Sequence, residues 1–506
     1  MKKKGFKKNH LFKSHESDAI KSQFNRINNW LWEIPKSFRS DMRVPARIYA
    51  SEKIFQDIEN EALEQLINTT TLPGIIKYAL GMPDIHSGFG PPIGGVGVMK
   101  LSDGVISPGF VGYDENCGVR LLLSNYQEKE VTPYLEKLAQ EIQKEIPSGL
   151  GKGRQVKLSI EQVDRILEQG VSYLVEQGYG EKEDIENCEE EGKMEEAETS
   201  CVSNLAKNRG KNQVGTLGSG NHFIEIQKVE EIFDEKVAES FGLFKEQIVI
   251  MVHSGSRGLG HQNCTDYLKV AIESLSKYKI KLVDRELACM PFNSPEGQSF
   301  FKAMSAACNY AWANRQMMTF YIRKAWKNIL GKNTNLKLLY DVAHNIAKIE
   351  EHEVDGKMTK LIVHRKGATR AFPPNHLEVP EKYRSVGQPV LLPGTMGTSS
   401  FICSGLEESK ESWYTVSHGA GRIMSRNEAM RRISGQEVVN SLKLKGIIVK
   451  CQSIRGIAEE APLAYKNIDN VVEVVHQAGL SKKVAKLTPL VVIKGCLLYT
   501  SPSPRD

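Results

Sequence analysis

The sequence predicts a mixed α/β fold, an α+β arrangement of short strands, glycine-rich loops and several helices. Three observations lead to this prediction. Short apolar runs of strand character alternate with longer segments of helical spacing along the 506 residues. Many of the apolar runs end in a loop rich in glycine, and several of these loops contain a histidine. The composition, with 40% hydrophobic and 25% charged residues, is that of an ordinary globular protein.

The chain is expected to consist of one domain with a short segment at each end. Residues 1–25 are polar and rich in lysine, which predicts a basic, disordered tail. Residues 26–495 carry the alternating elements and predict a single domain. Residues 496–506 have no helical or strand period, and we interpret them as an appended tail outside the fold.

Composition indicates a soluble, cytoplasmic protein without a membrane segment. The nine cysteines include no CxxC pair, which favours a reducing compartment. The basic N-terminus is not followed by the apolar stretch of a signal peptide, and no apolar run reaches the ~18 residues needed to span a bilayer. The net charge of +6 is too small to indicate a nucleic-acid partner by itself.

The first elements follow from the spacing of apolar residues. Asn29–Ile34 and Arg43–Ile48 have the composition of short strands, and Ser51–Asn68 has helical spacing. The next stretch, 72–120, is dense in glycine and proline between short apolar runs. It predicts tightly wound strands and loops of the kind that line a site.

Two helices and an acidic segment follow. A helix is predicted for Pro133–Glu145 with Thr132 as its N-cap, and another for Ile160–Gln177, which begins with the capping-box pattern Ser159-Ile-Glu-Gln. Glu181–Glu198 is strongly acidic, and we expect an exposed segment rather than a set of ligands.

The second half continues the mixed pattern. Phe300–Ile329 has the spacing of a long helix whose aromatic and methionine side chains form core. A helix is predicted near Ile457–Tyr465, a strand or helix near Val471–Gln477, and an apolar run ends at Lys494.

The stretch 109–120, GFVGYDENCGVR, is the first candidate site. It places Asp114 and Cys117, an oxygen and a sulfur ligand, among glycines that let the backbone turn sharply. An acid and a thiol in such a loop are typical of a metal site, although a buried structural cysteine would give the same pattern. Asp84 and His86 are further polar candidates, and His86 fits a hydrogen-bonded core histidine equally well.

Four glycine-rich or strand-ending loops each carry a histidine. They are GTLGSGNHFIEIQ with His222, IVIMVHSGSRGLG with His253, LLYDVAHNIAKI with His344, and YTVSHGAGRIMSR with His418. If the loops converge, three imidazoles with the acid and the thiol suffice for two metal ions bridged by the cysteine. Mixed nitrogen, oxygen and sulfur ligands suit Mn²⁺ or Zn²⁺, and paired ions recur in phosphoryl chemistry.

One histidine is then left over as a candidate nucleophile toward phosphorus. The small residues after His418, Gly419-Ala420-Gly421, would leave room for a bulky adduct. The residues alone do not decide which histidine has this role. They indicate a metal-dependent site that handles phosphate.

Several segments resemble the signature blocks of the RtcB family of RNA-splicing ligases, in that family's order. They are GVISPGFVGYDENCGVRL, GTLGSGNHFIEIQ, VHSGSRGLGHQ, YDVAHNIAK, VHRKGATRAF, GQPVLLPGTMGTSSF and SHGAGRIMSR. The resemblance runs from about residue 29 to residue 495. It implies the family's own α/β fold, with a central metal-binding cleft built from short strands and glycine-rich loops.

The resemblance implies a GTP-dependent RNA ligase of tRNA splicing or RNA repair, with two Mn²⁺ ions in the active site. Such enzymes join an RNA end bearing a 2′,3′-cyclic phosphate or 3′-phosphate to a 5′-hydroxyl end. A cyclic phosphate is first opened, and a histidine takes GMP from GTP. The GMP passes to the RNA 3′-phosphate, and the 5′-hydroxyl displaces it. RNA is the implied partner, and some members need an archease-type activator.

The resemblance also implies roles for particular residues. Asp114 and His222 match the ligands of one ion, His253 and His344 match those of the other, and Cys117 bridges the two.

His418 matches the guanylylated histidine, and Asp84 resembles a residue that orients it. Guanylate contacts are implied for Asn221, His222, Phe223, Ile224, Glu225, His344, Asn345, Pro393, Gly394, Thr395, Met396, Ser400, His418, Gly419, Ala420, Gly421 and Lys494. RNA contacts are expected at Arg257, Arg365, Lys366 and Arg370.

Two other functions share the predicted ligands. A dinuclear phosphoesterase or cyclic phosphodiesterase without ligation would need the same metal site. An RNA-binding protein with a structural metal would not need so many open polar loops. The physiological RNA, the oligomeric state and the metal used in the cell do not follow from the sequence.

Overall fold

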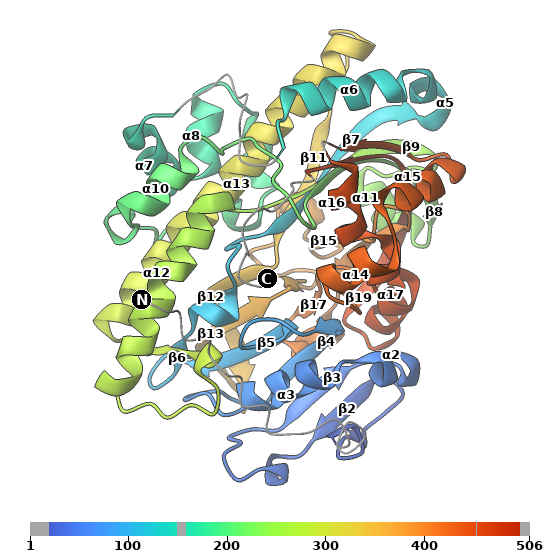
Figure 1. Cartoon of the computed structure of the whole chain (residues 1–506). Helices are drawn as coiled ribbons and strands as arrows, with labels where there is room; N and C mark the ends of the chain where they lie inside the picture. Colours follow the sequence, from blue (N-terminus) through green and yellow to red (C-terminus); the bar gives the residue numbers. More distant parts are fainter. Residues whose placement is uncertain (1–19, 149–157, 452, 496–506) are drawn as a thin grey trace.

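The computed structural model describes residues 20–148, 158–451 and 453–495. Two large β-sheets form the centre of the molecule, and helices cover its flanks (Figure 1). This architecture confirms the predicted mixed α/β fold. Among the helices of these residues, none is both long and apolar enough to cross a membrane.

The first sheet has seven strands in the order β1-β2-β3-β4-β5-β13-β12. Its long hairpin β12–β13 is antiparallel throughout, and β3 and β4 pair in parallel. The strands are β1 (Asn25–Arg26), β2 (Leu31–Ile34), β3 (Ala46–Tyr49), β4 (Ala79–His86), β5 (Ile93–Lys100), β12 (Asn345–Val354) and β13 (Lys357–Lys366).

The second sheet has eight strands in the order β11-β7-β9-β8-β19-β16-β15, with β18 paired to β19. They are β7 (Gly118–Gln127), β8 (Phe223–Ile232), β9 (Gln247–Ser254), β11 (Lys337–Ala343), β15 (Pro389–Leu392), β16 (Ser400–Gly405), β18 (Ile448–Cys451) and β19 (Ser481–Lys494). Two small sheets pair β6 (Val105–Ile106) with β10 (Met290–Pro291) and β14 (Ala368–Arg370) with β17 (Thr415–Ser417).

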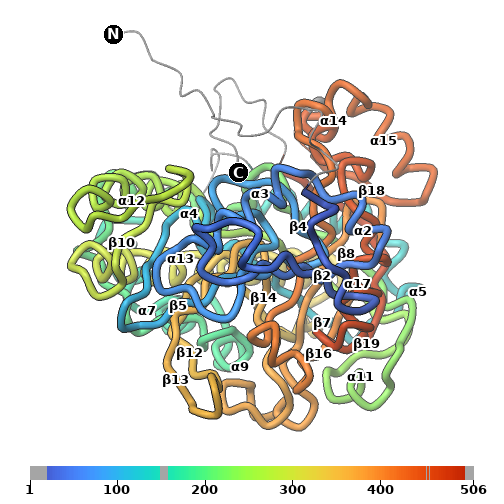
Figure 2. Tube along the Cα trace, turned by 90° about the horizontal axis from the view of Figure 1, so that it is seen from below, coloured from blue at the N-terminus to red at the C-terminus, as the bar shows by residue number. Residues whose placement is uncertain are grey.

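Helices gather on two opposite flanks of the sheets, as Figures 1 and 2 both show. On one flank, α12 (Arg257–Lys277) packs beside the long α13 (Pro295–Leu330). The other flank carries α14 (Arg426–Arg432), α15 (Gly435–Leu444) and α17 (Ile468–Gln477). The remaining helices are α2 (Glu52–Asp57), α3 (Asn60–Thr69), α4 (Pro108–Val111), α5 (Glu128–Val131), α6 (Leu135–Glu145), α7 (Ile160–Gln169), α8 (Val171–Glu176), α9 (Lys182–Glu186), α10 (Asn204–Gly210), α11 (Glu235–Phe241) and α16 (Ile454–Ile457).

Helix α13 forms the core predicted for 300–329 and begins five residues earlier. The Ser294 hydroxyl accepts the Gly297 N–H at 3.0 Å, which caps the helix before Pro295. Trp312 and Trp326 on this helix are fully buried in the apolar core. The prediction of a core helix is confirmed.

Some predicted helices are interrupted or capped differently. The predicted helix at 51–68 is two helices that meet at Ile58, and that at 160–177 breaks at Gly170, whose φ is +58°. The capping box of Ser159 with Gln162 is confirmed. Thr132 does not cap α6; its hydroxyl donates to the Glu128 carbonyl. Residues 458–464 are mostly 3-10 turns, and 471–477 belongs to helix α17.

The acidic segment 181–198 is not simply an exposed face. Asp184 is buried, and both of its oxygens accept from Arg323, at 2.6 and 2.7 Å. Glu189 is also buried and lies 2.5 Å from the ammonium of Lys348. The prediction of an exposed segment is therefore wrong at these positions, because cations from α13 and β12 neutralise the acids inside the protein.

The N-terminal boundary also differs from the prediction. Ile20 and Phe24 are buried, and the Phe24 ring packs on Phe55 with centroids 5.4 Å apart. Residues 20–25 therefore belong to the domain rather than to a tail. The predicted tails at 1–19 and 496–506 lie outside the described residues.

Candidate active site

Four neighbouring strands bring the predicted imidazole and thiol ligands to one edge of the second sheet. Cys117, His222, His253 and His344 lie at ends of β7, β8, β9 and β11. These strands have the order β11-β7-β9-β8, and each neighbouring pair is antiparallel. The start of one strand therefore lies beside the end of the next. Residues more than 200 positions apart in the chain meet at this edge.

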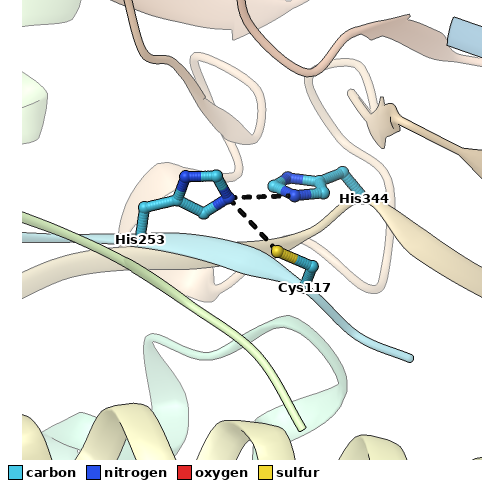
Figure 3. Close-up of side chains that lie close together, drawn as sticks. All are labelled: Cys117, His253 and His344. Carbon is cyan, nitrogen blue, oxygen red and sulfur yellow. Dashed lines mark hydrogen bonds between the residues drawn. The ribbon is translucent and has the colours of Figure 1, made fainter. Parts of the chain in front are cut away.

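Two groups of three ligand atoms overlap at Cys117. One group is Cys117, His253 and His344, and the other is Asp114, Cys117 and His222; within each group the atoms lie within 4.8 Å of one another. The sulfur of Cys117 is 3.2 Å from His253 Nε2 and 3.4 Å from His222 Nε2. Figure 3 shows the side chains of His253 and His344 pointing toward this sulfur. One sulfur atom therefore belongs to both groups.

The orientation of His222 fits a bound cation. Its Nδ1 lies 3.1 Å from the Leu217 carbonyl, which can only accept, so Nδ1 carries the ring proton. The lone pair of Nε2 then faces Asp114 Oδ2 at 2.8 Å. Two acceptors at this distance need a positive charge between them. Burial acts to raise the pKa of Asp114, and the charge of Arg257 is among the effects that lower it.

The other two imidazoles are held in the neutral form that binds metal. Burial, followed by the charges of neighbouring histidines, places the pKa of His253 and His344 well below the usual value. Their Nε2 atoms are 3.3 Å apart, and His344 Nδ1 has no hydrogen-bond partner among the described residues. Imidazole, thiolate and carboxylate together fit a borderline divalent ion such as Mn²⁺ or Zn²⁺.

His418 lies beside the ligand groups without belonging to either. Its ring centroid is 5.1 Å from that of His344, and its Nδ1 is 2.6 Å from Asp84 Oδ2. The same oxygen accepts the backbone N–H of His418 at 2.9 Å. Although burial acts to raise the pKa of Asp84, the charges of His418 and Lys466 lower it. An ionised carboxylate therefore orients the ring, with the lone pair on Nε2.

Two glycines allow the backbone to pass close to the acids. Gly421 has a φ of +69°, and a side chain there would collide with the Asp84 carbonyl. A side chain at Gly255 would collide with the carboxylate of Asp114.

The site opens to solvent at two of its members. The side chains of Asp114 and His418 are 27% and 14% exposed, whereas that of His222 is 6% exposed. Cys117, His253 and His344 are buried. Asp114 and His418 are therefore the members of the site that solvent reaches most.

Several of the residues predicted to contact guanylate are joined to one another by hydrogen bonds. Gln227 donates to Glu225 at 2.7 Å and to the Ser400 hydroxyl at 3.1 Å, and that hydroxyl also accepts the Gly394 N–H. Burial raises the pKa of Glu225 to about 8, against the hydrogen bond of Gln227 and the charge of Lys494. A neutral acid is therefore present at the start of β8.

The two predicted glycine loops meet each other. A side chain at Gly419 would approach the Pro393 carbonyl to 2.8 Å, so the loops 419–421 and 393–396 are adjacent. The Lys494 ammonium donates to the Gly220 carbonyl at 2.9 Å, beside the half-buried Asn221. The Asn345 amide donates to the Asp114 carbonyl at 3.1 Å.

Not every predicted contact residue presents its side chain to the opening. Ile224 and Met396 are buried in apolar clusters, so their side chains form core. The Phe223 ring packs against His253 with centroids 5.4 Å apart. Thr395 bonds within its own turn, because its N–H donates to the Thr398 hydroxyl at 2.8 Å.

The expected RNA contacts at Arg365 and Arg370 are corrected by the structure. Arg365 is fully buried and pairs with Glu350. Arg370 is 1% exposed and lies 2.8 Å from Glu190 and 2.6 Å from Glu378. Both guanidinium groups neutralise internal carboxylates, so they are not available to a phosphate backbone.

The other two basic candidates differ from each other. Lys366 is 5% exposed, and its ammonium donates to the carbonyls of Phe89 and Pro91 at 2.5 and 3.0 Å, so it holds a loop. Arg257 is half-buried at the start of α12, and its charge acts on Asp114. Of the four candidates, Arg257 is the one that lies beside predicted metal ligands.

Sequence reasoning missed the residues that support the site from behind. Arg315 on α13 is fully buried, pairs with Asp341 at 2.8 Å, and donates to the carbonyls of Asn116 and Ser254 at 2.8 Å each. It joins the beginning of β7 to the end of β9. A charged residue within an otherwise apolar helical pattern was the available signal.

The fold and the site define a mixed α/β protein with a candidate dinuclear metal centre beside a histidine that is not a ligand. The chain belongs to the RtcB family: the family model described as tRNA-splicing ligase RtcB matches residues 65–495. A tRNA-splicing ligase RtcB of Archaeoglobus fulgidus is 51% identical over 93% of this chain and 98% of its own length. One of Methanococcus maripaludis is 49% identical over 94% of this chain and 100% of its own length.

The similarity extends to a eukaryote. An RNA-splicing ligase RtcB homolog 1 of Entamoeba dispar is 46% identical over 92% of this chain and 89% of its own length. The resemblance to the RtcB family inferred from the sequence is thereby confirmed.

Proposed function

We propose that the chain is a GTP- and Mn²⁺-dependent RNA ligase that joins 2′,3′-cyclic phosphate or 3′-phosphate ends of RNA to 5′-hydroxyl ends. One observation carries the proposal. A histidine outside both ligand groups, His418, has its ring 5.1 Å from a ligand ring and one nitrogen held by Asp84. The names of the relatives, tRNA-splicing ligases, support RNA as the substrate.

Two ions would be held by the overlapping groups. Asp114, Cys117 and His222 would hold one Mn²⁺ ion, and Cys117, His253 and His344 the other. When bound, the ions supply positive charge that offsets the charge on the phosphate oxygens.

His418 would act as the nucleophile. Its Nε2 forms a bond to the α-phosphorus of GTP, while the bond from that phosphorus to the β-phosphate oxygen breaks and pyrophosphate leaves. Asp84 keeps the proton on Nδ1 and stabilises the positive charge that develops on the ring.

RNA would then be joined in two further displacements. A 3′-phosphate oxygen of the RNA attacks the phosphorus of the adduct, and the bond to His418 Nε2 breaks. The 5′-hydroxyl oxygen of the second RNA end attacks the 3′-phosphorus and loses its proton, and GMP leaves. Arg257 is the candidate for the RNA backbone.

The guanylate would lie among the loops that surround His418. Asn221, Glu225, Ser400, Lys494 and the turns 393–396 and 419–421 are the proposed contacts, as the resemblance implies. Their mutual placement around the opening supports this assignment.

The cellular role belongs to the same proposal. tRNA splicing, RNA repair or both would use this chemistry, and an archease-type activator is a candidate partner. A cytoplasmic location is supported by the cysteines at the described positions, none of which forms a disulfide.

Label transfer from GTP tests the proposal. Incubation with α-labelled GTP and Mn²⁺ should leave an acid-labile label on the wild-type protein and on a His376→Ala control, but none on His418→Ala. A metal-loaded wild-type protein that opens a cyclic phosphate and takes no label would indicate a phosphodiesterase instead. Ligation activity retained in His418→Ala would contradict the nucleophile assignment.

A further inference from the structure

The segment before α17 holds together the two loops that position His418. The Lys466 N–H donates to the Gly421 carbonyl at 2.9 Å, three residues beyond the nucleophile. The Lys466 ammonium donates to the carbonyls of Pro83 and Ile85, at 3.1 and 2.5 Å. These two carbonyls flank Asp84, so one residue binds both the histidine loop and the acid loop.

The Lys466 side chain is placed there at a cost. It is 8% exposed, and burial lowers the pKa of its ammonium to about 8, although the charge of Asp84 acts in the opposite direction. A buried ammonium is retained where its hydrogen bonds and charge are needed. Here its bonds set the backbone on both sides of Asp84, and its charge adds to that of His418 in lowering the pKa of that carboxylate.

We propose that Lys466 is a positioning residue for guanylyl transfer: it fixes the carboxylate of Asp84 against Nδ1 of His418. The inference rests on the proposed function and deepens it. The Lys466 ammonium is bonded to the carbonyls that flank Asp84, so it acts through Asp84 and not on the nucleotide. Its loss should therefore slow transfer to His418 and leave GTP binding nearly unchanged.

A cavity lined in part by Lys466 makes the proposal testable by rescue. The cavity has a volume of about 270 Å³ and is lined by residues that include Lys466, Ile54, Ile423, Tyr465 and Asn470. Truncation to alanine would also empty the space that the Lys466 side chain fills beside the carbonyls of Pro83 and Ile85. Propylammonium has the three carbons and the nitrogen that Lys466→Ala removes, and it can enter there.

The experiment measures single-turnover label transfer from α-labelled GTP with Mn²⁺. Lys466→Met and Lys466→Ala should slow transfer about 10- to 100-fold, as expected for lost positioning. The GTP concentration for half-maximal rate and the bound Mn²⁺ should change less than about twofold. Propylammonium should restore the rate of label transfer in Lys466→Ala, and propanol should not. The control is Lys483→Met, whose ammonium pairs with Glu473 of α17 at 2.8 Å.

Transfer at the wild-type rate in both variants would overturn the proposal, as would a loss that propylammonium does not restore. Ring ¹⁵N spectra of metal-free, histidine-labelled protein distinguish failure of the positioning role of Lys466 from failure of the proposed function. Wild-type protein should hold His418 as the Nδ1–H tautomer, and Lys466→Met should mix the tautomers, whether or not GTP labels the protein. Identical His418 signals in the two proteins would refute the role.

Discussion

Removing the shared sulfur should affect metal binding differently from removing a ligand of one group. Cys117 belongs to both groups of ligand atoms, whereas Asp114 belongs to one. Cys117→Ala should therefore weaken both ions, and Asp114→Ala mainly one. The prediction concerns the number of ions bound, so it does not depend on catalysis.

The expected loss of metal affinity follows from the number of ligands that each substitution removes from each group. Loss of a partner that merely supports a ligand weakens metal binding about 10- to 100-fold. Loss of one of three ligands is expected to cost at least about 100-fold, or about 2.8 kcal/mol. With free Mn²⁺ at about ten times the wild-type dissociation constant, mass action gives about 1.8 ions per wild-type chain. The same arithmetic gives about 1.0 for Asp114→Ala and about 0.2 for Cys117→Ala.

Equilibrium dialysis against Mn²⁺ with metal analysis of the protein measures these counts. Cys289→Ala is the matched control, because Cys289 is equally buried and belongs to neither ligand group. It should bind as much metal as wild-type protein. Equal losses in Cys117→Ala and Asp114→Ala would refute the bridging role of the sulfur.

Three further predictions concern RNA, pH and stability. Arg257→Gln should weaken RNA binding and lower the slope of log affinity against log salt by about one. Arg365→Gln should leave that slope unchanged and lower the unfolding free energy by about 3–5 kcal/mol, because buried Glu350 loses its guanidinium partner and keeps only His352. A changed slope in Arg365→Gln, measured by fluorescence anisotropy, would restore Arg365 as an RNA contact. Glu225, with a pKa of about 8, is protonated at pH 7 in the free protein. If guanylate donates to the Glu225 carboxylate, binding releases a proton, so the affinity for GMP should rise about tenfold per pH unit from pH 6 to pH 8 and level off above pH 8. Calorimetry of GMP binding to wild-type and Glu225→Gln proteins checks this. A pH-independent affinity in the wild type would exclude the contact. Asp184→Ala should lower the unfolding free energy by about 3–5 kcal/mol, because it leaves buried Arg323 without its carboxylate partner. The control Glu195→Ala, at a side chain that is 80% exposed, should lower it by less than about 0.5 kcal/mol. Similar thermal shifts in the two variants would contradict the buried ion pair.

The local elements were largely predictable because they depend on nearby residues. The apolar spacing of α13, the capping box at Ser159 and the strand-like runs before His253 and His344 are properties of short windows. The interruptions at Ile58 and Gly170 were not predicted, since apolar spacing continues across both positions.

The candidate ligands were predictable as residue types in a recurring pattern, together with a family resemblance. Their distances were not, because they depend on the strand order β11-β7-β9-β8, which joins segments far apart in the chain. The residue types alone left the odd histidine open, and the family resemblance implied His418; the structure adds its contact with Asp84, which comes from the other sheet.

The charged residues show most clearly which features the sequence determines and which depend on the tertiary structure. The sequence establishes that Arg365, Arg370 and the acids of 181–198 are present, and from a single chain such charges are expected at the surface. Only the tertiary structure pairs Arg365 with Glu350 and Arg370 with Glu190 in the interior. The physical reason is that a charge can be buried when an opposite charge from a distant segment reaches it, and chain order does not contain that distance. The candidate ligands were therefore predictable as residue types, whereas packing decided which charged residues form internal ion pairs.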